Sequence, residues 1–432
     1  MMLEIKKALK PFDAVVKAPP SKSYTNRALL IAALSGGKTV ILNALESDDT
    51  KYMEEALRQL GIDVEKKGDT YTVFGKGGRL ETPEEPIYLG NAGTAMRFLT
   101  TASALVDSGH VILKGNERMS ERPMGDLLLA LKLIGVNAHS VMNNGCPPVV
   151  VEGGGIAGGM TKINGDKSSQ YFTSILLSAP YAKKDVVIKT VGELTSKPYI
   201  DMTISSMREF GVNVENEDYR SFKVKARQTY YARDYIVEGD YSSASYLFAA
   251  AAVTGSRIRV TGINPNSAQG DKDFVDALVR MGCSKDTGND WIEIRGPQKL
   301  KAIPEIDMNH MPDVAMTLAV VAAFAIGTTK IVNVANMRIK ETDRIKATVA
   351  ELKKTGVNAE ELPDGMIVEG GTPHGALIET YDDHRIAMCF AVLGLVAEGI
   401  VLTDEKCVSK TYPDFFEVIE DMVKQKTTGV ME

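Results

Sequence analysis

Six helical segments rich in small apolar residues recur along the chain, and each is followed by a short run of β-branched residues. The helical segments are NRALLIAALSGG, MRFLTTASALVDSG, YFTSILLSAPYAK, ASYLFAAAAVTG, VAMTLAVVAAFAIG and RIAMCFAVLGLVAEG. The β-rich runs are TVILNAL, HVILKGN, DVVIKTV, SRIRVTG, TKIVNVA and IVLTDEK. Five helical segments end in glycine and recur in steps of about 72 residues, which indicates an internal repeat. We expect these glycines to take the left-handed conformation that stops a helix: Gly37, Gly109, Gly255, Gly327 and Gly399.

A second helix is predicted after each β-rich run. In five copies it ends in a shared pattern around a glycine: RQLGIDV, KLIGVNA, REFGVNV, VRMGCSK and KKTGVNA. Two strands around a polar turn follow, as in DVEKKGDTYTVFG, and the sixth copy stops within its second helix, DFFEVIEDMVKQ. Each copy therefore reads helix, strand, helix, hairpin. Such a unit cannot bury both faces alone, so several must pack together, and the spacing leaves open how the six divide between domains.

Length and composition favour a water-soluble globular protein of two large domains. The chain has 432 residues, of which 44% are hydrophobic and 25% charged, and its formal net charge is −6. That charge points neither to nucleic acid nor to an anionic membrane. The four cysteines show no metal-ligand spacing, and the start lacks the apolar core of a signal peptide. The longest apolar run, Val314 to Gly327, is shorter than the roughly 20 residues of a membrane span, so we expect a cytoplasmic protein.

Each of the six first helices begins with a polar segment. These segments are PPSKSYTNR, LGNAGTAMR, GDKSSQYF, GDYSSASY, NHMPDVAM and YDDHRIAM. Their Ser, Thr, Asn, Asp and Gly residues suit helix caps, and every start would satisfy that interpretation. Free N–H groups at a helix start also bind phosphate or carboxylate. The second interpretation is favoured by the basic residues mixed in: Lys22, Arg27, Arg97, Lys167 and Arg385.

The loops after the first strands add charge. GNERMSERPMG carries Arg118 and Arg122, LTSKPY carries Lys197, and DEKCVSKTYPD carries Lys406 and Lys410. In RIKETDR acids and bases are densely mixed, which suits a site that binds anions and transfers protons.

Two further residues have alternative interpretations that the pattern leaves open. Asp313 could cap a helix or serve as a base, and His384 could be structural or catalytic. The sequence has no GxxxxGK[ST] loop, no GxGxxG opening a βαβ unit, no HExxH and no GxSxG. What remains is cofactor-free chemistry on anionic small molecules.

The motifs together resemble the family of 5-enolpyruvylshikimate-3-phosphate synthase, also called 3-phosphoshikimate 1-carboxyvinyltransferase. The matching stretches run from about residue 19 to 416: PSKSYTNRALLIAALSGG, LGNAGTAMRF, SERPMGDL, DKSSQYFTSILLSAP, SKPYIDMT, EGDYSSASYLFAAAA, DMNHMPDVAMTLA, RIKETDRI, YDDHRIAM and KTYPDFF. The resemblance implies an α/β (α+β) fold of two domains, each of three βαβαββ units, in the inside-out α/β barrel of the enolpyruvyl transferases. One domain would span residues 20–237, and the other residues 1–19 plus 238–432.

The resemblance also implies the activity. The enolpyruvyl group of phosphoenolpyruvate would move to the 5-hydroxyl of shikimate 3-phosphate through a tetrahedral adduct, with release of phosphate. This step belongs to the shikimate route to chorismate and the aromatic amino acids. The family uses no organic cofactor or metal, its members are usually monomers, and its known inhibitor is glyphosate. The expected partners are therefore the two small-molecule substrates alone, with no nucleic acid and no membrane.

Matching motifs carry the family's site residues onto this chain. Those expected to bind shikimate 3-phosphate are Lys22, Ser23, Arg27, Ser168, Ser169, Gln170, Ser196, Tyr199, Asp313, Asn336 and Lys340. Those expected around phosphoenolpyruvate are Lys22, Asn91, Gly93, Thr94, Arg122, Gln170, Arg344, Arg385 and Lys410. The expected catalytic residues are Lys22, Asp313, Glu341 and His384. Asp313 fits a base at the hydroxyl, and either Glu341 or Lys22 fits the group that handles the proton at C3.

One departure and three alternatives complete the prediction. Phe98 stands where many members of the family have proline. We expect the loss of this proline to loosen the helix, and it leaves sensitivity to glyphosate open. The related UDP-N-acetylglucosamine enolpyruvyl transferases usually carry a reactive cysteine in a loop that here reads KGNERMSERP, whereas Cys146 lies on a later turn. A non-catalytic anion-binding repeat protein would leave Asp313 and Glu341, set among so many bases, unexplained. A kinase or phosphatase is a weaker third alternative.

Overall fold

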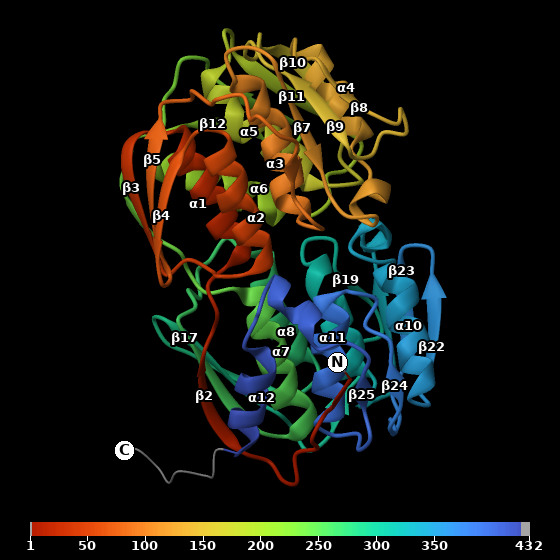
Figure 1. Cartoon of the computed structure of the whole chain (residues 1–432). Coiled ribbons are helices and arrows are strands. Elements are labelled where there is room, and N and C mark those ends of the chain that lie inside the picture. Colours follow the sequence, from red (N-terminus) through yellow and green to blue (C-terminus); the bar gives the residue numbers. More distant parts are fainter. Residues whose placement is uncertain (1, 425–432) are drawn as a thin grey trace. The chain divides into compact units, whose positions relative to one another are not determined.

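The computed structural model describes residues 2–424 (Figure 1). Clustering of contacts divides the chain into two compact units. The central unit is Pro20–Val237, and the terminal unit combines the described parts of Met1–Pro19 and Glu238–Glu432. Each unit holds three copies of the repeat.

The central unit contains three four-stranded sheets, each built on the same plan. Their orders are β14-β3-β5-β4, β6-β7-β9-β8 and β10-β11-β13-β12. In each sheet the first two strands are parallel and the remaining pairs antiparallel. The strands are β3 (Gly36–Leu42), β4 (Asp63–Lys67), β5 (Thr70–Lys76), β6 (Ile87–Tyr88), β7 (His110–Lys114), β8 (Ala138–Ser140), β9 (Val149–Glu152), β10 (Gly159–Asn164), β11 (Val186–Val191), β12 (Val214–Glu217), β13 (Ser221–Val224) and β14 (Asp234–Ile236). The helices are α1 (Lys22–Leu34), α2 (Asp48–Gln59), α3 (Gly93–Ala102), α4 (Gly125–Leu133), α5 (Ser169–Ser178) and α6 (Lys197–Glu209), with 3₁₀ turns η1 (Ser103–Leu105), η2 (Met119–Glu121) and η3 (Ala179–Tyr181).

The terminal unit repeats the plan with one incomplete copy. Its sheets have the orders β16-β17-β15-β2, β19-β21-β23-β22, β1-β25-β24 and β18-β20. The strands are β1 (Leu3–Glu4), β2 (Asp13–Lys17), β15 (Arg257–Thr261), β16 (Ser284–Thr287), β17 (Trp291–Arg295), β18 (Leu300–Lys301), β19 (Ile306–Asp307), β20 (Ala325–Ile326), β21 (Thr328–Val332), β22 (Asn358–Leu362), β23 (Gly365–Glu369), β24 (Leu377–Ile378) and β25 (Val401–Leu402). The helices are α7 (Tyr241–Thr254), α8 (Phe274–Arg280), α9 (Ala315–Ala322), α10 (Arg344–Lys354), α11 (His384–Gly394) and α12 (Phe415–Lys424), with η4 (Gly270–Asp273), η5 (Pro312–Val314), η6 (Ala335–Ile339) and η7 (Lys406–Lys410). The last residue of the sixth predicted helix, Gln425, lies outside the described residues.

The predicted order of helix, strand, helix and hairpin is confirmed, and the structure adds a short parallel strand before each first helix. Two of these added strands pair with a sheet of the other half of the sequence. Strand β2 precedes α1 but pairs with β15, while β14 precedes α7 but pairs with β3. The described part of the sixth copy ends with α12, and β1 pairs antiparallel with β25 at the position of a hairpin strand in the other copies. The result in each unit is the βαβαββ plan that the resemblance implies.

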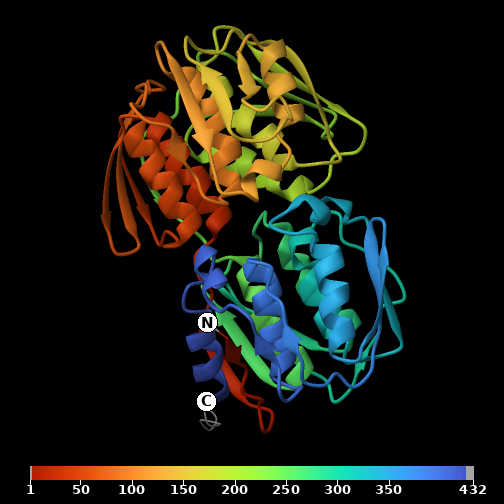
Figure 2. The same cartoon turned by 45° about the vertical axis from the view of Figure 1, so that its right-hand side comes forward.

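Three first helices form the centre of each unit because their residues are mostly apolar or small on every side. Helix α3 contacts α1 and α5, and α7, α9 and α11 contact one another. Every residue of α9 and α11 is buried, as are all residues of α3. Figures 1 and 2 show sheets and second helices around these central helices in each unit. A helix that is apolar all round needs such a position, because it has no face suited to water.

All five glycines of the first series have the expected positive φ, but only one of them stops a helix. Of the first series, only Gly255 is a left-handed helix cap; Gly37 lies within β3 and the others precede the following strand. The second series does the capping. After α2, the Gly61 N–H donates to the Arg58 carbonyl and the Ile62 N–H donates to the Leu57 carbonyl. These two hydrogen bonds define a Schellman motif. The same pair of bonds follows α4, α6, α8 and α10, at Gly135, Gly211, Gly282 and Gly356.

Replacing one of these caps tests the backbone argument. Gly282 has φ +104°, and an added Cβ would lie 3.7 Å from its nearest atom, on Pro297, so the strained φ would be the main cost. We expect Gly282→Ala to lower the free energy of unfolding by roughly 1–2 kcal/mol in urea titrations, with kcat unchanged. Gly371→Ala is the control, because its Cβ would meet no described atom within 4 Å and its φ is not positive. Equal stability of the two variants would contradict the assignment.

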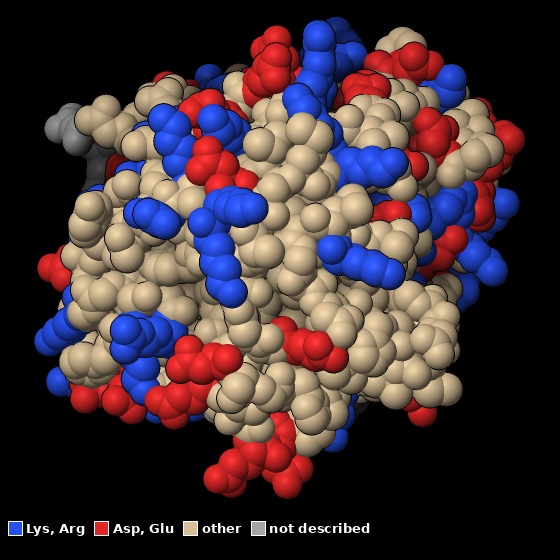
Figure 3. Space-filling view, turned by 90° about the horizontal axis from the view of Figure 1, so that it is seen from above, with Lys and Arg blue, Asp and Glu red and all other residues tan. Residues whose placement is uncertain are grey.

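The surface carries charges of both signs. On the face shown in Figure 3, Lys and Arg side chains are interspersed with Asp and Glu side chains, as expected from 50 basic and 56 acidic residues. Within residues 2–424, no helix is both long and apolar enough to cross a membrane.

Candidate active site

Helix α1 begins at a group of polar residues in the central unit. Ser21 caps it by accepting a hydrogen bond from the Tyr24 N–H. The next residue, Lys22, forms an ion pair of 3.1 Å with the buried Asp49 of α2. Sequence reasoning missed Asp49, whose position at the start of α2 reads as an ordinary helix-start acid. Ser23 follows Lys22 in the first turn and is half-buried.

Arg27 is a buried cation whose partners are neutral oxygens. Its Nε donates to Thr203 Oγ1 (2.9 Å), Nη1 to the Ser23 carbonyl (2.8 Å) and Nη2 to the Tyr199 carbonyl (2.9 Å). The guanidinium also lies over the ring of Phe98, 5.3 Å from its centroid. Burial lowers the pKa of Arg27 to about 10, so it stays charged at neutral pH. A buried positive charge bonded to neutral groups suits a bound anion.

Helix α3 starts without a side-chain cap and with two guanidinium groups beside it. Its N-cap residue is Ala92 and no side chain caps it, so the capping interpretation does not hold at this start. A Cβ on Gly93 would lie 2.4 Å from Arg97 Nη1 and 2.6 Å from Arg122 Nη2, so only glycine allows this approach. Arg122 Nη1 donates to the side-chain oxygen (2.9 Å) and the carbonyl (3.1 Å) of Asn91. The uncapped N–H groups and both cations make this an anion-binding arrangement.

Helix α3 is continuous through Phe98, which is buried. Gln170 of α5 joins its start, because Gln170 Nε2 donates to Thr94 Oγ1 at 3.3 Å. Arg97 was noted in the sequence only as a basic residue at a helix start, whereas its contact with Gly93 depends on the fold.

The starts of α5 and α6 complete the polar residues of the central unit. Ser168 caps α5 by accepting from the Gln170 N–H, and Ser169 is buried behind it. Ser196 precedes α6 with φ +56°, a left-handed conformation that is uncommon outside glycine. Tyr199, in the first turn of α6, supplies the carbonyl that binds Arg27. The structure therefore connects the predicted residues of α1 and α6 through one arginine.

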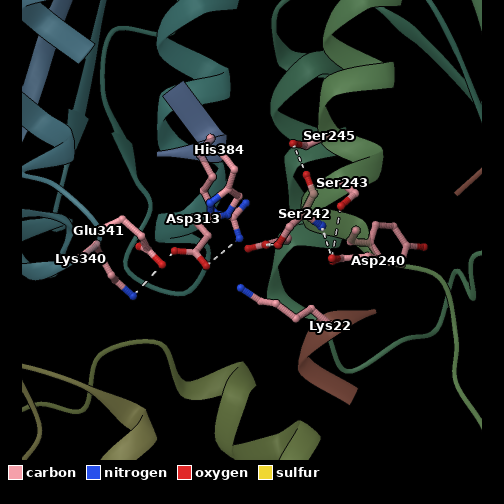
Figure 4. A network of polar contacts seen from close by, with 12 residues as sticks. Lys22, Asp240, Ser242, Ser243, Ser245, Asp313, Lys340, Glu341 and His384 are labelled. Carbon is pink, nitrogen blue, oxygen red and sulfur yellow. Dashed lines mark hydrogen bonds and ion pairs between the residues drawn. The ribbon is translucent and has the colours of Figure 1, made fainter. Parts of the chain in front are cut away.

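In the terminal unit, Asp313 is surrounded by three cations. Its carboxylate lies 3.0 Å from Arg385, 3.3 Å from Arg344 and 3.7 Å from Lys340. Figure 4 shows Asp313, Lys340 and Glu341 converging beside His384. Burial opposes ionisation of Asp313, but Arg385, Lys340 and Arg344 outweigh it and hold its pKa well below the usual range. Asp313 does not cap a helix, because it lies within η5 and α9 begins at Ala315 without a side-chain cap.

Arg344 links three acids. Besides Asp313, it binds Glu341 at 2.8 Å and grips Asp383 with Nε (2.7 Å) and Nη2 (3.1 Å). Glu341 also pairs with Lys410 at 2.9 Å. Burial disfavours the charged guanidinium, but the acids, Asp383 first, raise the pKa of Arg344 overall. The predicted residues of RIKETDR, YDDHR and KTYPD thus meet in one ion-pair network.

Two other expected residues lie at the same end of the unit. His384 is buried in the first turn of α11, with Nδ1 at 3.8 Å from Asp383. Asn336 is buried in η6. Asp383 caps α11 by accepting from the Arg385 N–H, so one carboxylate fixes both the helix start and Arg344.

No sequence pattern pointed to Asp271, a buried carboxyl near Asp313. It lies in η4 and accepts a hydrogen bond from Ser242 Oγ of α7. Figure 4 shows Ser242 beside Asp240, which caps α7. Burial first, and then the charge of Asp313, raise the pKa of Asp271 to about 7, against a lowering by Arg385. Only the fold brings the QGD turn that carries Asp271 to this point.

This raised pKa predicts a pH dependence of stability. Because the folded chain holds the Asp271 proton more tightly than the unfolded chain, the stabilisation is full at acid pH and is lost as pH rises toward about 7. We expect Asp271→Asn, which cannot ionise, to remove that loss, so the variant gains on the wild type between pH 5 and 7.5 in urea unfolding. A stability difference that stays constant over this interval would contradict the assignment.

Among residues 2–424, no cluster of three or more His, Cys, Asp or Glu side chains is arranged to hold a metal ion. The basic residues described above divide between the two units. Lys22, Arg27, Arg97 and Arg122 lie in the central unit, and Lys340, Arg344, Arg385 and Lys410 in the terminal unit.

Comparison with known proteins relates the whole chain to one family. The family model of EPSP synthase (3-phosphoshikimate 1-carboxyvinyltransferase) matches residues 6–419. The 3-phosphoshikimate 1-carboxyvinyltransferase of Vibrio atlanticus (strain LGP32) is 47% identical over 421 residues, covering 95% of this chain and 98% of the relative. That of Sulfurovum sp. (strain NBC37-1) is 46% identical over 425 residues, covering 96% and 98%. An EPSP synthase structure from Acinetobacter baumannii has a TM-score of 0.82 at 26% identity and covers 98% of both chains. The resemblance seen in the motifs is confirmed, and the chain belongs to the EPSP synthase family.

Proposed function

We infer that this chain catalyses the reaction of its family, in which phosphoenolpyruvate and shikimate 3-phosphate give 5-enolpyruvylshikimate 3-phosphate and phosphate. The observation that carries this inference is the family match over residues 6–419, together with relatives of 46–47% identity named for that activity. The chain is a transferase of aromatic amino acid biosynthesis. The rival nucleotide-sugar acceptor and the non-catalytic scaffold find no support in these names.

We assign acceptor binding to Arg27 of the central unit, whose hydrogen-bond partners are neutral oxygens, and to its neighbours. The Arg27 guanidinium is charged and buried, and it lies beside Ser23 and Tyr199. Such a group forms strong, charge-assisted bonds to phosphate or carboxylate oxygens. Contacts to shikimate 3-phosphate are assigned to Lys22, Ser23, Arg27, Ser168, Ser169, Gln170, Ser196, Tyr199, Asp313, Asn336 and Lys340.

For the donor, we assign the uncapped start of α3 and the arginines of the terminal unit. Gly93 and Thr94 offer backbone N–H groups, and Arg122 lies against them. Two guanidinium groups, Arg344 and Arg385, already bind carboxylates in the structure, and phosphoenolpyruvate carries both carboxylate and phosphate. Contacts to phosphoenolpyruvate are assigned to Lys22, Asn91, Gly93, Thr94, Arg122, Gln170, Arg344, Arg385 and Lys410.

We assign Asp313 as the base. The 5-hydroxyl oxygen attacks C2 of phosphoenolpyruvate and its proton passes to Asp313, while C3 gains a proton to become a methyl group. The low pKa of Asp313 in the structure makes it a weak base, because Arg344 and Arg385 stabilise its charge. Phosphoenolpyruvate bound to these arginines shares their charge, which raises the proton affinity of Asp313 when it is needed.

The second half of the reaction removes a proton from C3 and expels phosphate. Two groups remain candidates for the C3 proton: Glu341, held between Lys410 and Arg344, and Lys22, paired with Asp49. His384, buried beside Asp383, is assigned a supporting position near the donor. The cations of the site neutralise the phosphate that leaves.

We also propose that the protein acts as a monomer in the cytoplasm, needs no cofactor or metal, and binds its two substrates alone.

The test is phosphate release by the purified chain in metal-free buffer. Phosphoenolpyruvate is supplied with shikimate 3-phosphate, with unphosphorylated shikimate or with UDP-N-acetylglucosamine. We expect release with shikimate 3-phosphate only. Release with the nucleotide sugar would keep the donor and overturn the acceptor, and no release in any mixture would overturn the catalytic function.

A further inference from the structure

Two residues on one face of α10 form hydrogen bonds to the segment Glu379–Arg385. Arg344, at the start of the helix, binds Asp383 through two hydrogen bonds. Seven residues later, on the same face, Glu351 binds the beginning of that segment. Between them, Thr348 Oγ1 donates to the Arg344 carbonyl (2.7 Å) and is buried. The segment that presents His384 and Arg385 is thus fixed at both ends by one helix.

Glu351 is fully buried and each of its oxygens is engaged. Oε1 accepts from the Tyr381 hydroxyl at 2.6 Å. Oε2 accepts from the Glu379 N–H at 3.0 Å and pairs with Lys354 at 2.7 Å. Burial first, and then the hydrogen bond and charge of Glu351, raise the pKa of Tyr381, so its hydroxyl remains a donor at neutral pH. A buried carboxylate is costly, and here it holds a loop rather than filling the core.

The held loop contains backbone that would not keep its shape unaided. Tyr381 and Asp382 have φ +55° and +51°, two successive left-handed residues that are not glycine. Each such residue is strained and persists only where its surroundings fix it. Directly after them come Asp383, His384 and Arg385, the first turn of α11 and its cap. Three residues of backbone separate Tyr381 from Arg385, so the turn and the start of α11 belong to one short segment.

We propose that Glu351 and Tyr381 are positioning residues for phosphoenolpyruvate, which hold the left-handed turn so that Arg385 and Arg344 keep the spacing that the donor requires. The contact touches neither substrate; it acts through the Glu379–Arg385 segment. This inference rests on the proposed function, since it takes Arg344 and Arg385 as donor-binding residues.

Tyr381→Phe removes the hydroxyl and keeps the ring. Because the lost bond is to a charged group, we expect the KM for phosphoenolpyruvate to rise about tenfold, with the KM for shikimate 3-phosphate within about twofold of the wild type. Glu351→Gln, which keeps an acceptor oxygen, should give a smaller rise of the same kind. An unchanged KM for phosphoenolpyruvate, or an equal rise for both substrates, overturns the proposal even if the Tm falls.

Two reference variants separate this idea from its alternatives. Tyr230→Phe removes another buried hydroxyl bond, to the Leu177 carbonyl (2.9 Å) in the central unit, so it should lower the Tm without changing the ratio of the two KM values. Arg385→Lys tests the proposed function itself. If Arg385→Lys leaves the KM for phosphoenolpyruvate unchanged, the donor assignment fails; if it raises that KM while Tyr381→Phe does not, only the positioning role fails.

Discussion

Asp313→Asn is expected to lower kcat by about 10³-fold while leaving the KM for phosphoenolpyruvate unchanged or lower, the pattern of a lost general base. The amide keeps the shape of the side chain but cannot take the hydroxyl proton. It also leaves Arg344, Arg385 and Lys340 with one counter-charge fewer, so their attraction for an anionic donor increases. Steady-state kinetics with each substrate varied in turn would measure both effects.

A surface acid provides the matched control for this variant. Asp276→Asn breaks an exposed pair with Lys285 (3.0 Å) and should leave both kinetic constants unchanged. If Asp313→Asn raised the KM for phosphoenolpyruvate and spared kcat, Asp313 would be a structural partner of the arginines and the base would have to be sought elsewhere.

Arg27→Ala is expected to raise the KM for shikimate 3-phosphate by about 10²-fold with a much smaller change in kcat. Each charge-assisted bond to an anion contributes roughly 1.5–3 kcal/mol, and a guanidinium can make two in parallel. The charge is available because its present partners, Thr203 and the carbonyls of Ser23 and Tyr199, are neutral. The same kinetics as above, with shikimate 3-phosphate varied, provide the measurement.

Arg27 also ties α1 to α6, so truncation is expected to lower the Tm as well. Arg27→Lys separates the two effects, because it keeps the charge but lacks the planar fork, and the rise in KM should be intermediate. A fall in Tm with an unchanged KM would mean that Arg27 serves only to join the helices. A rise in the KM for phosphoenolpyruvate instead would move Arg27 from the acceptor contacts to the donor contacts.

Much of the fold could be predicted from local pattern. The central helices, the strands after them and the hairpins each carry a strong signal in residue type and period. Three of the added parallel strands, β6, β19 and β24, carried no such signal. Each has two residues, and no period can be read from two residues. In the first glycine series the role of helix cap was right only for Gly255, since a glycine after a helix pattern can be either a cap or the turn into a strand, and the hydrogen bonds distinguish the two.

Within the site, the same division holds residue by residue. The basic residues at helix starts and in RIKETDR were visible, but the buried acids Asp49, Asp271 and Glu351 were not. Each of these acids sits at an ordinary position on its own helix or turn, and its importance comes from burial beside a partner distant in the chain. Burial and neighbouring charge are properties of the packed chain, so no local pattern reports them.

The sequence by itself determined the repeat, the family and the set of chemical groups, because these depend on residue type and spacing along the chain. The tertiary structure decided which strand completes which sheet, as β2 joins β15 and β14 joins β3. It also decided which charges neutralise one another, so that Asp313 is held by three cations while Arg27 keeps neutral partners. Both depend on distances between residues far apart in the chain, and only packing sets those distances.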